Sequence, residues 1–97
     1  METNSKTNWL IHLYISGKTP RTRQTVALLE QICREQFKGQ GVIKVIDVFQ
    51  DPLACMEEKI IATPTLIKKY PEPVRRIIGD LSDKEKLLSG LSIIHQE

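Results

Sequence analysis

Few side chains in this sequence could carry out covalent or metal chemistry. Cys33 and Cys55 could serve as nucleophiles or redox thiols, but they lie far apart and form no CxxC motif. His12 and His95 could bind a metal or move protons, but no histidine cluster accompanies the cysteines. We therefore predict buried, inert thiols, exposed or half-exposed histidines, and neither a metal site nor a cofactor.

Basic side chains offer a second kind of chemistry, the binding of carboxylates on a partner protein. Arg75 and Arg76 are adjacent in a predicted strand, so they point to opposite faces, and one could bind a partner while the other solubilises the sheet. Lys44, Lys59 and Lys68 could form a positive surface, or they could be three solvated side chains. A net charge of +2 and an aromatic content of 5% are too low to predict a nucleic acid partner.

Hydrophobic patterning predicts seven elements in the order βαβαββα. Segment 42–49 is nearly continuous in apolar residues, which is typical of a strand covered on both faces and paired in a parallel βαβ unit. Two prolines in segment 70–73 predict a stiff turn within a hairpin. The predicted strands are 9–15, 42–49, 65–69 and 74–78, and the predicted helices are 20–38, a short helix after Asp51-Pro52 and a last helix after Ser82.

Each predicted helix begins with a polar cap. Thr19-Pro20 and Asp51-Pro52 combine a capping side chain with a proline in the first turn, and Ser82 with Glu85 forms a capping box. Gly39 is expected to end the first helix. The apolar stripes are Val26, Leu29, Cys33 and Phe37 in the first helix, Leu53, Met56 and Ile60 in the second, and Leu87, Leu88, Leu91 and Ile94 in the third.

Gly90 makes the last quarter of the chain ambivalent. It interrupts the third helix at a cost of about 1 kcal/mol relative to alanine. The alternation of Leu91 and Ile93 would suit a strand as well as a helix.

The order βαβαββα, with the step Thr63-Pro64-Thr65 before the third strand, resembles the α/β thioredoxin-like fold. In that fold a cis proline stands beside the active site, and Pro64 is expected to be a structural corner of this kind. The redox motif of thioredoxin is absent, since the first strand is followed by Ser16-Gly-Lys-Thr-Pro20. A thiol oxidoreductase is therefore an unfavoured alternative.

Five longer strings narrow the resemblance further. They are Leu13-Tyr-Ile-Ser-Gly-Lys-Thr-Pro20, Phe37-Lys-Gly39, Lys44-Val-Ile-Asp-Val48, Ile61-Ala-Thr-Pro-Thr-Leu66 and Pro73-Val-Arg-Arg-Ile-Ile-Gly-Asp-Leu-Ser82. Together they make the chain similar to the KaiB family over residues 9–94. The resemblance implies a non-catalytic regulator that binds the hexameric ATPase KaiC and, in full clock systems, helps to sequester KaiA and competes with a SasA-type kinase. A stress-adaptation system or simpler timer is the other setting it implies.

The resemblance also implies a fold-switching protein, with a self-associated resting form of order βαββααβ and a thioredoxin-like form that binds KaiC. Lys59, Gly90 and Ser92 fall at positions where the family's fold balance and KaiC binding are sensitive. Ser92 replaces an aspartate that is common in the family. The resting form is expected to be a homo-dimer or tetramer.

We expect residues 1–97 to form a single domain with a flexible amino-terminal segment 1–8. The longest apolar run near the start is too short for a signal peptide or a membrane span, so a cytoplasmic protein without a membrane partner is expected. A stand-alone sensor module resembling the SasA amino-terminal domain is a further alternative. Such a module should show little self-association, which light scattering would detect.

Overall fold

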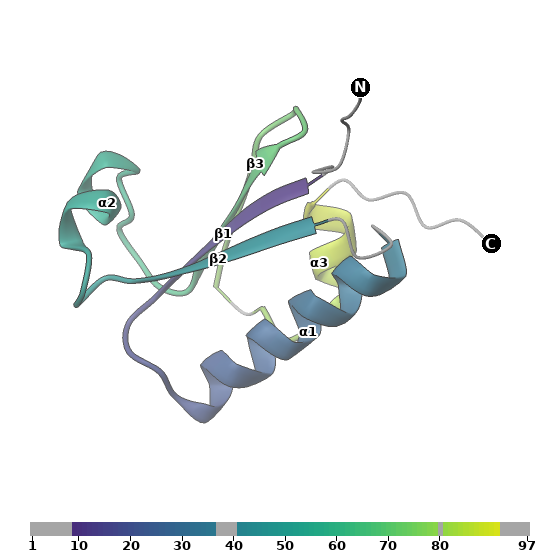
Figure 1. Cartoon of the computed structure of the whole chain (residues 1–97), viewed down its shortest axis with the longest axis horizontal. Helices are drawn as coiled ribbons and strands as arrows, with labels where there is room; N and C mark the ends of the chain where they lie inside the picture. The colour runs from purple at the N-terminus through teal and green to yellow at the C-terminus, as the bar shows by residue number, and fades with distance from the viewer. Residues whose placement is uncertain (1–8, 37–40, 80, 92–97) are drawn as a thin grey trace, which may run out of the picture.

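Seven secondary-structure elements follow one another in the order βαβαββα in the computed structural model, which describes residues 9–36, 41–79 and 81–91 (Figure 1). This order is the one that the hydrophobic pattern predicts. The strands are β1 (Trp9–Ile15), β2 (Gly41–Asp47), β3 (Thr65–Tyr70) and β4 (Arg75–Ile78), and the helices are α1 (Pro20–Gln36), α2 (Pro52–Glu57) and α3 (Lys84–Gly90).

The four strands form one mixed sheet in the order β2-β1-β3-β4. Strand β1 runs parallel to β2 and antiparallel to β3, and β3 forms an antiparallel hairpin with β4. The parallel βαβ unit and the hairpin are therefore confirmed. Compared with the prediction, β3 extends one residue further, to Tyr70, and β4 begins one residue later, at Arg75.

Helices α1 and α3 cover one face of the sheet (Figure 1). Their apolar side chains pack against the odd-numbered residues of β1, because alternate residues of a strand point to the same side. An ion pair joins the two helices, with Lys84 Nζ 2.6 Å from Glu35 Oε1. The buried residues of this main core are Ile11, Leu13, Ile15, Leu29, Ile32, Cys33, Leu66, Leu81, Leu87, Leu88 and Leu91.

Helix α1 begins where the sequence predicts. The hydroxyl of Thr19 accepts a hydrogen bond from the amide of Thr22 at 3.2 Å, and Pro20 is the first helical residue. The helix is described as far as Gln36. Residues 37–38 and the expected cap at Gly39 lie outside the described residues.

Strand β2 differs from the prediction in length and in burial. It ends at Asp47, two residues early, because the Asp47 carboxylate accepts a hydrogen bond from the amide of Phe49 at 2.9 Å and turns the chain. It is also an edge strand, so Val42 and Val45 are 46% and 39% exposed instead of covered on both faces. An apolar run predicts a strand but not the strand's place in the sheet.

Helix α2 has the predicted cap but a different buried side. The carboxylate of Asp51 accepts a hydrogen bond from the amide of Ala54 at 3.1 Å. The predicted stripe is wrong for Leu53 and Met56, which are exposed, whereas Ile60 packs against the core as predicted and Cys55 is buried beside it. A helix of six residues has so few apolar positions that spacing alone does not decide which side faces the sheet.

The carboxyl end of α2 is a Schellman turn in which a lysine occupies the position that usually holds glycine. The amide of Lys59 donates to the carbonyl of Met56 at 3.1 Å, and the amide of Ile60 donates to the carbonyl of Cys55 at 3.0 Å. Lys59 has a φ of 57°, in the left-handed region. A residue with a Cβ atom in this region costs about 1 to 2 kcal/mol.

Helix α3 begins one residue later than the capping box predicts. The carboxylate of Asp83 accepts hydrogen bonds from the amides of Glu85 and Lys86, at 2.9 Å and 3.4 Å. Asp83, and not Ser82, therefore caps the helix. Its predicted apolar residues are buried, except Ile94, which lies outside the described residues together with Ser92 and His95.

Gly90 is the last residue of α3 and lies against β4. A Cβ atom at this position would come within 2.6 Å of Ile77 Cδ1 and 3.0 Å of Ile77 Cγ1. The missing side chain thus allows α3 to approach β4 closely, which explains a glycine in a helix.

We expect the effect of Gly90→Ala on the unfolding free energy to be about 1 kcal/mol more destabilising in the wild type than in an Ile77→Ala background. The shortened Ile77 side chain would leave room for the new methyl group. Urea unfolding of the four proteins of this double-mutant cycle measures the difference. Equal effects in both backgrounds would show that Ile77 moves aside without cost.

We expect Lys59→Gly to raise the unfolding free energy of this fold by about 0.5 to 1 kcal/mol, because it relieves the left-handed strain at the end of α2 and loses only part of that gain to chain entropy. Lys59→Gln is the control, since it removes the charge but keeps the Cβ atom. Urea denaturation compares the variants. An equal gain in Lys59→Gln would assign the effect to charge.

Candidate functional site

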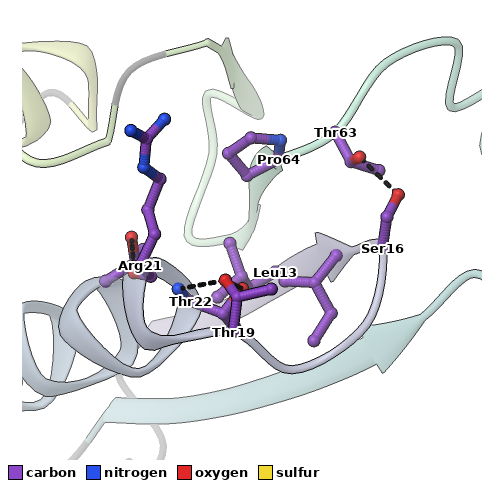
Figure 2. A pocket seen from close by; sticks show the side chains of 9 residues that line it. Leu13, Ser16, Thr19, Arg21, Thr22, Thr63 and Pro64 are labelled. Carbon is purple, nitrogen blue, oxygen red and sulfur yellow. Dashed lines mark hydrogen bonds between the residues drawn. The ribbon is translucent and has the colours of Figure 1, made fainter.

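A pocket of about 170 Å³ lies between the amino-terminal end of α1 and the Thr63–Pro64 peptide (Figure 2). This peptide is cis, the isomer that the sequence predicts. In the thioredoxin-like fold that the sequence resembles, the active site stands beside such a cis proline. Its lining residues include no cysteine and are Leu13, Ile15, Ser16, Thr19, Arg21, Thr22, Thr25, Thr63 and Pro64.

Hydroxyl groups in this pocket bind one another or the backbone. Ser16 Oγ and Thr63 Oγ1 lie 2.6 Å apart, which joins the residue after β1 to the turn before Pro64 (Figure 2). The hydroxyl of Thr25 donates to the carbonyl of Arg21 at 3.2 Å. Hydroxyls and carbonyls do not take up a proton at neutral pH, so these contacts do not activate a nucleophile.

Neither cysteine lines this pocket, and both are buried, as predicted. Cys33 lies in the main core and Cys55 packs between α2 and the sheet. Burial raises the pKa of both thiols, and the negative charges of Glu30 near Cys33 and of Asp51 near Cys55 raise it further. Both thiols are therefore protonated at neutral pH and are poor nucleophiles.

The sheet face opposite α1 and α3 is only partly covered. Helix α2 packs there through Cys55 on Tyr14, Ile46 and Ile67. The uncovered part carries one basic residue from each strand. These residues, here termed the open-face cluster, are Lys44 of β2, His12 of β1, Lys69 of β3 and Arg76 of β4.

Strand register brings the open-face cluster together. His12 is paired with Lys44 in β2 and with Ile67 in β3, and Ile67 is paired with Arg76 in β4. Paired residues of neighbouring strands point to the same side of a sheet. Lys69 reaches this side as well, since it binds a residue at the end of α2.

Glu58, directly after α2, is that residue. Its Oε2 atom accepts a hydrogen bond from Lys69 Nζ at 2.6 Å, its Oε1 atom lies 3.5 Å from Arg76 Nη2, and its carbonyl accepts from Arg76 Nη1 at 3.0 Å. These contacts hold the end of α2 to the β3–β4 hairpin. The hydrogen bond from Lys69 lowers the pKa of Glu58, and the positive charges of Lys69 and Arg76 add to this effect.

Four large apolar side chains are exposed on and beside α2. Phe49, Leu53, Met56 and Ile61 are 74%, 63%, 72% and 88% exposed, and they are here termed the α2 apolar patch. Leu53 and Met56 lie one turn apart on the same side of the helix. Exposed apolar side chains gathered around one element are typical of a protein interface.

Lys68 does not lie where the sequence analysis places it. It is 2% exposed, and its Nζ atom lies 4.8 Å from the centroid of the Trp9 ring. Burial lowers the pKa of Lys68, and the positive charge of Arg75 lowers it further. The face of the ring attracts the ammonium group and so partly offsets the cost of burying it. Lys68 is therefore neither a solvated side chain nor part of an exposed positive surface.

The other predicted basic residues are exposed on different parts of the molecule. Lys44 and Arg76 lie on the open face, and Arg75 points to the other side of β4. Lys59 ends α2 next to the α2 apolar patch. Ser92 lies outside the described residues, and His12 is half-buried as predicted.

Sequence reasoning missed Glu58 and the α2 apolar patch. The patch had a signal, since Phe49, Leu53, Met56 and Ile61 give this short segment more apolar residues than a six-residue helix can bury. Glu58 had none, because its partners come from strands that follow it in the chain.

Two further properties concern only residues 9–36, 41–79 and 81–91. This part of the chain contains no group of three or more histidine, cysteine, aspartate or glutamate side chains that could hold a metal ion. It also contains no helix with the length and apolar character needed to cross a membrane.

Comparison with known proteins identifies the family. A model of the KaiB domain matches residues 12–93. The chain belongs to the KaiB family. It is 47% identical over 94 residues to the circadian clock oscillator protein KaiB of Prochlorococcus marinus (strain NATL2A), covering 97% of this chain and 88% of that protein. It is 46% identical over 92 residues to KaiB1 of Synechocystis sp., covering 95% and 88%.

Solved structures similar to this KaiB-family chain confirm the thioredoxin-like fold. The amino-terminal domain of Synechococcus elongatus SasA matches with a TM-score of 0.72 and 21% identity, covering 95% of this chain and 90% of that one. A thioredoxin of Fasciola hepatica matches with a TM-score of 0.68 and 17% identity, covering 90% and 81%. Identities this low show a common fold and no more.

We expect Glu58→Gln to lower the unfolding free energy by about 0.5 to 1 kcal/mol at neutral pH, since its ion pairs are partly exposed. The pKa of Glu58 is lower in the folded than in the unfolded protein. The stabilisation by Glu58 is therefore fully present above the pKa that Glu58 has in the unfolded protein. It is lost as the pH falls through the pKa that Glu58 has in the folded protein.

Urea unfolding of the wild type and Glu58→Gln between neutral and acidic pH tests this expectation. The difference should shrink to zero at the acidic end. Glu57→Gln removes the exposed carboxylate of the preceding residue, the last of α2, and should have little effect at any pH. A constant difference over the whole range would contradict the ion-pair explanation.

Proposed function

We propose that this KaiB-family protein is a non-catalytic regulator that binds a KaiC-type hexameric ATPase. Its relatives are named as circadian clock oscillator proteins, which supports a regulatory role. The α2 apolar patch is the observation that carries a docking function, because such a surface is stabilised when a partner covers it. A thiol-free pocket and two protonated, buried thiols favour binding over thiol chemistry.

The docking surface that we propose has the α2 apolar patch at its centre and basic residues at its rim. Lys59 is exposed at the end of the same helix, and Lys44 and Arg76 are exposed on the adjoining open face. The matching surface of the ATPase would be apolar with carboxylates around it. Arg75 points to the other side of β4, so we assign it no contact in this interface.

A second arrangement of the chain, with the order βαββααβ, is part of this proposal. The described fold contains a left-handed lysine at position 59 and a glycine within helix α3 at position 90. Both features cost this fold free energy and so support a competing arrangement within a few kcal/mol. Self-association of that arrangement as a dimer or tetramer, and competition with KaiA or a SasA-type kinase, remain predictions.

The test is complex formation with a purified KaiC-type ATPase and ATP, followed over time by native mass spectrometry. We expect hexamers that carry up to six copies of this protein. Slow formation is expected if the binding-competent arrangement is scarce, because scarcity lowers the apparent affinity.

Matched variants locate the docking surface. Met56→Glu places a charge in the α2 apolar patch and should weaken binding about tenfold or more. Ala27→Glu introduces the same charge at an exposed position of α1 and should bind like the wild type. If Met56→Glu binds as tightly as the wild type, the interface lies elsewhere. If the wild type does not bind within a day, a KaiC-type ATPase is not the partner.

A further inference from the structure

The open-face cluster lies on the part of the sheet that α2 leaves uncovered. His12 and Lys44 are register partners on neighbouring strands. Lys69 comes from β3, the strand on the other side of β1. Among the charged residues, Lys69 lowers the pKa of His12 most. Lys44 is exposed and His12 is half-exposed, so one solute could contact both from the same side of the sheet.

Positive charge exceeds negative charge on this face. Lys69 and Arg76 share the carboxylate of Glu58, and Lys44 forms no ion pair with another residue that the structure describes. Like charges held close together repel one another, so a bound anion would relieve the repulsion. This repulsion also acts on His12: burial is the main reason for its lowered pKa, Lys69 and Lys44 lower it further, and Glu58 raises it.

The cluster also has hydrogen-bonding groups that an anion could use. His12 Nδ1 lies 3.4 Å from the hydroxyl of Tyr14, whereas His12 Nε2 has no hydrogen-bond partner within the described residues and donates once the imidazole is protonated. The ammonium group of Lys44 supplies further donors. Donors that arrive from three strands suit a compact anion with several acceptor oxygens and two negative charges, which describes a phosphoryl group better than a carboxylate.

We propose that His12, Lys44 and Lys69 form a binding site for a phosphoryl group on the open face of the sheet. The site shares Lys44 with the rim of the proposed docking surface but contains no residue of the α2 apolar patch, and its argument does not use the proposed ATPase partner. A free phosphate and the phosphate of a nucleotide share this chemistry.

The test is an NMR titration of the His12 imidazole with inorganic phosphate, compared with chloride at equal ionic strength. A bound dianion favours the protonated imidazole, so we expect phosphate to raise the pKa of His12 by about half a pH unit or more. His12→Asn identifies the signal, because His95 is the only other histidine in the sequence.

Two lysine variants provide the matched comparison. Lys44→Gln should weaken phosphate binding about threefold or more, since it removes a cation in register with His12. Lys86→Gln removes an exposed lysine from α3, which covers the opposite face, and should bind phosphate like the wild type. A His12 shift no larger than in chloride, or equal weakening by both variants, would overturn the proposal.

A parallel titration with adenosine monophosphate distinguishes the two sources. Equal affinity for this nucleotide and for phosphate would support a site that recognises the phosphoryl group alone. Tighter binding of the nucleotide, again weakened by Lys44→Gln, would support a nucleotide phosphate as the ligand.

Discussion

The double pairing of β1 is the constraint on which the rest of the structure depends. Strand β1 pairs with β2 along one edge and with β3 along the other, so its backbone groups are hydrogen-bonded on both edges and its register is fixed. A slip of one residue would turn Ile11 and Leu13 toward solvent and His12 into the main core. The same alternation therefore builds the core under α1 and α3 and places the basic residues on the open face.

Much of this arrangement could be predicted from local patterns. The element order, the caps at Thr19 and Asp51 and the β3–β4 hairpin depend on residues close together in the sequence. The edge position of β2 and the buried side of α2 depend on contacts between distant segments. Lys68 shows this difference most clearly, because in its buried position in β3 it packs against the ring of Trp9, which is far away in the sequence at the start of β1.

The candidate surfaces divide in the same way. A missing CxxC motif is visible in the sequence, and so is the likeness to KaiB that the family comparison confirms. The excess of apolar residues around α2 is visible in the sequence as well, whereas the open-face cluster emerges only when the four strands are placed side by side. Glu58 connects the two surfaces, since it follows the helix of the patch and binds two residues of the cluster. A partner that moves α2 would therefore also change the charges that Lys69 and Arg76 present.

The packing of Lys68 on Trp9 has a consequence for following this protein in solution. The sequence contains one tryptophan, so all of its tryptophan fluorescence comes from a ring with an ammonium group 4.8 Å from its centroid. A charge at this distance alters the emission of an indole, and the pair exists only while β1 and β3 are neighbours. The chain thus contains an intrinsic optical reporter of its own strand order, without any added label.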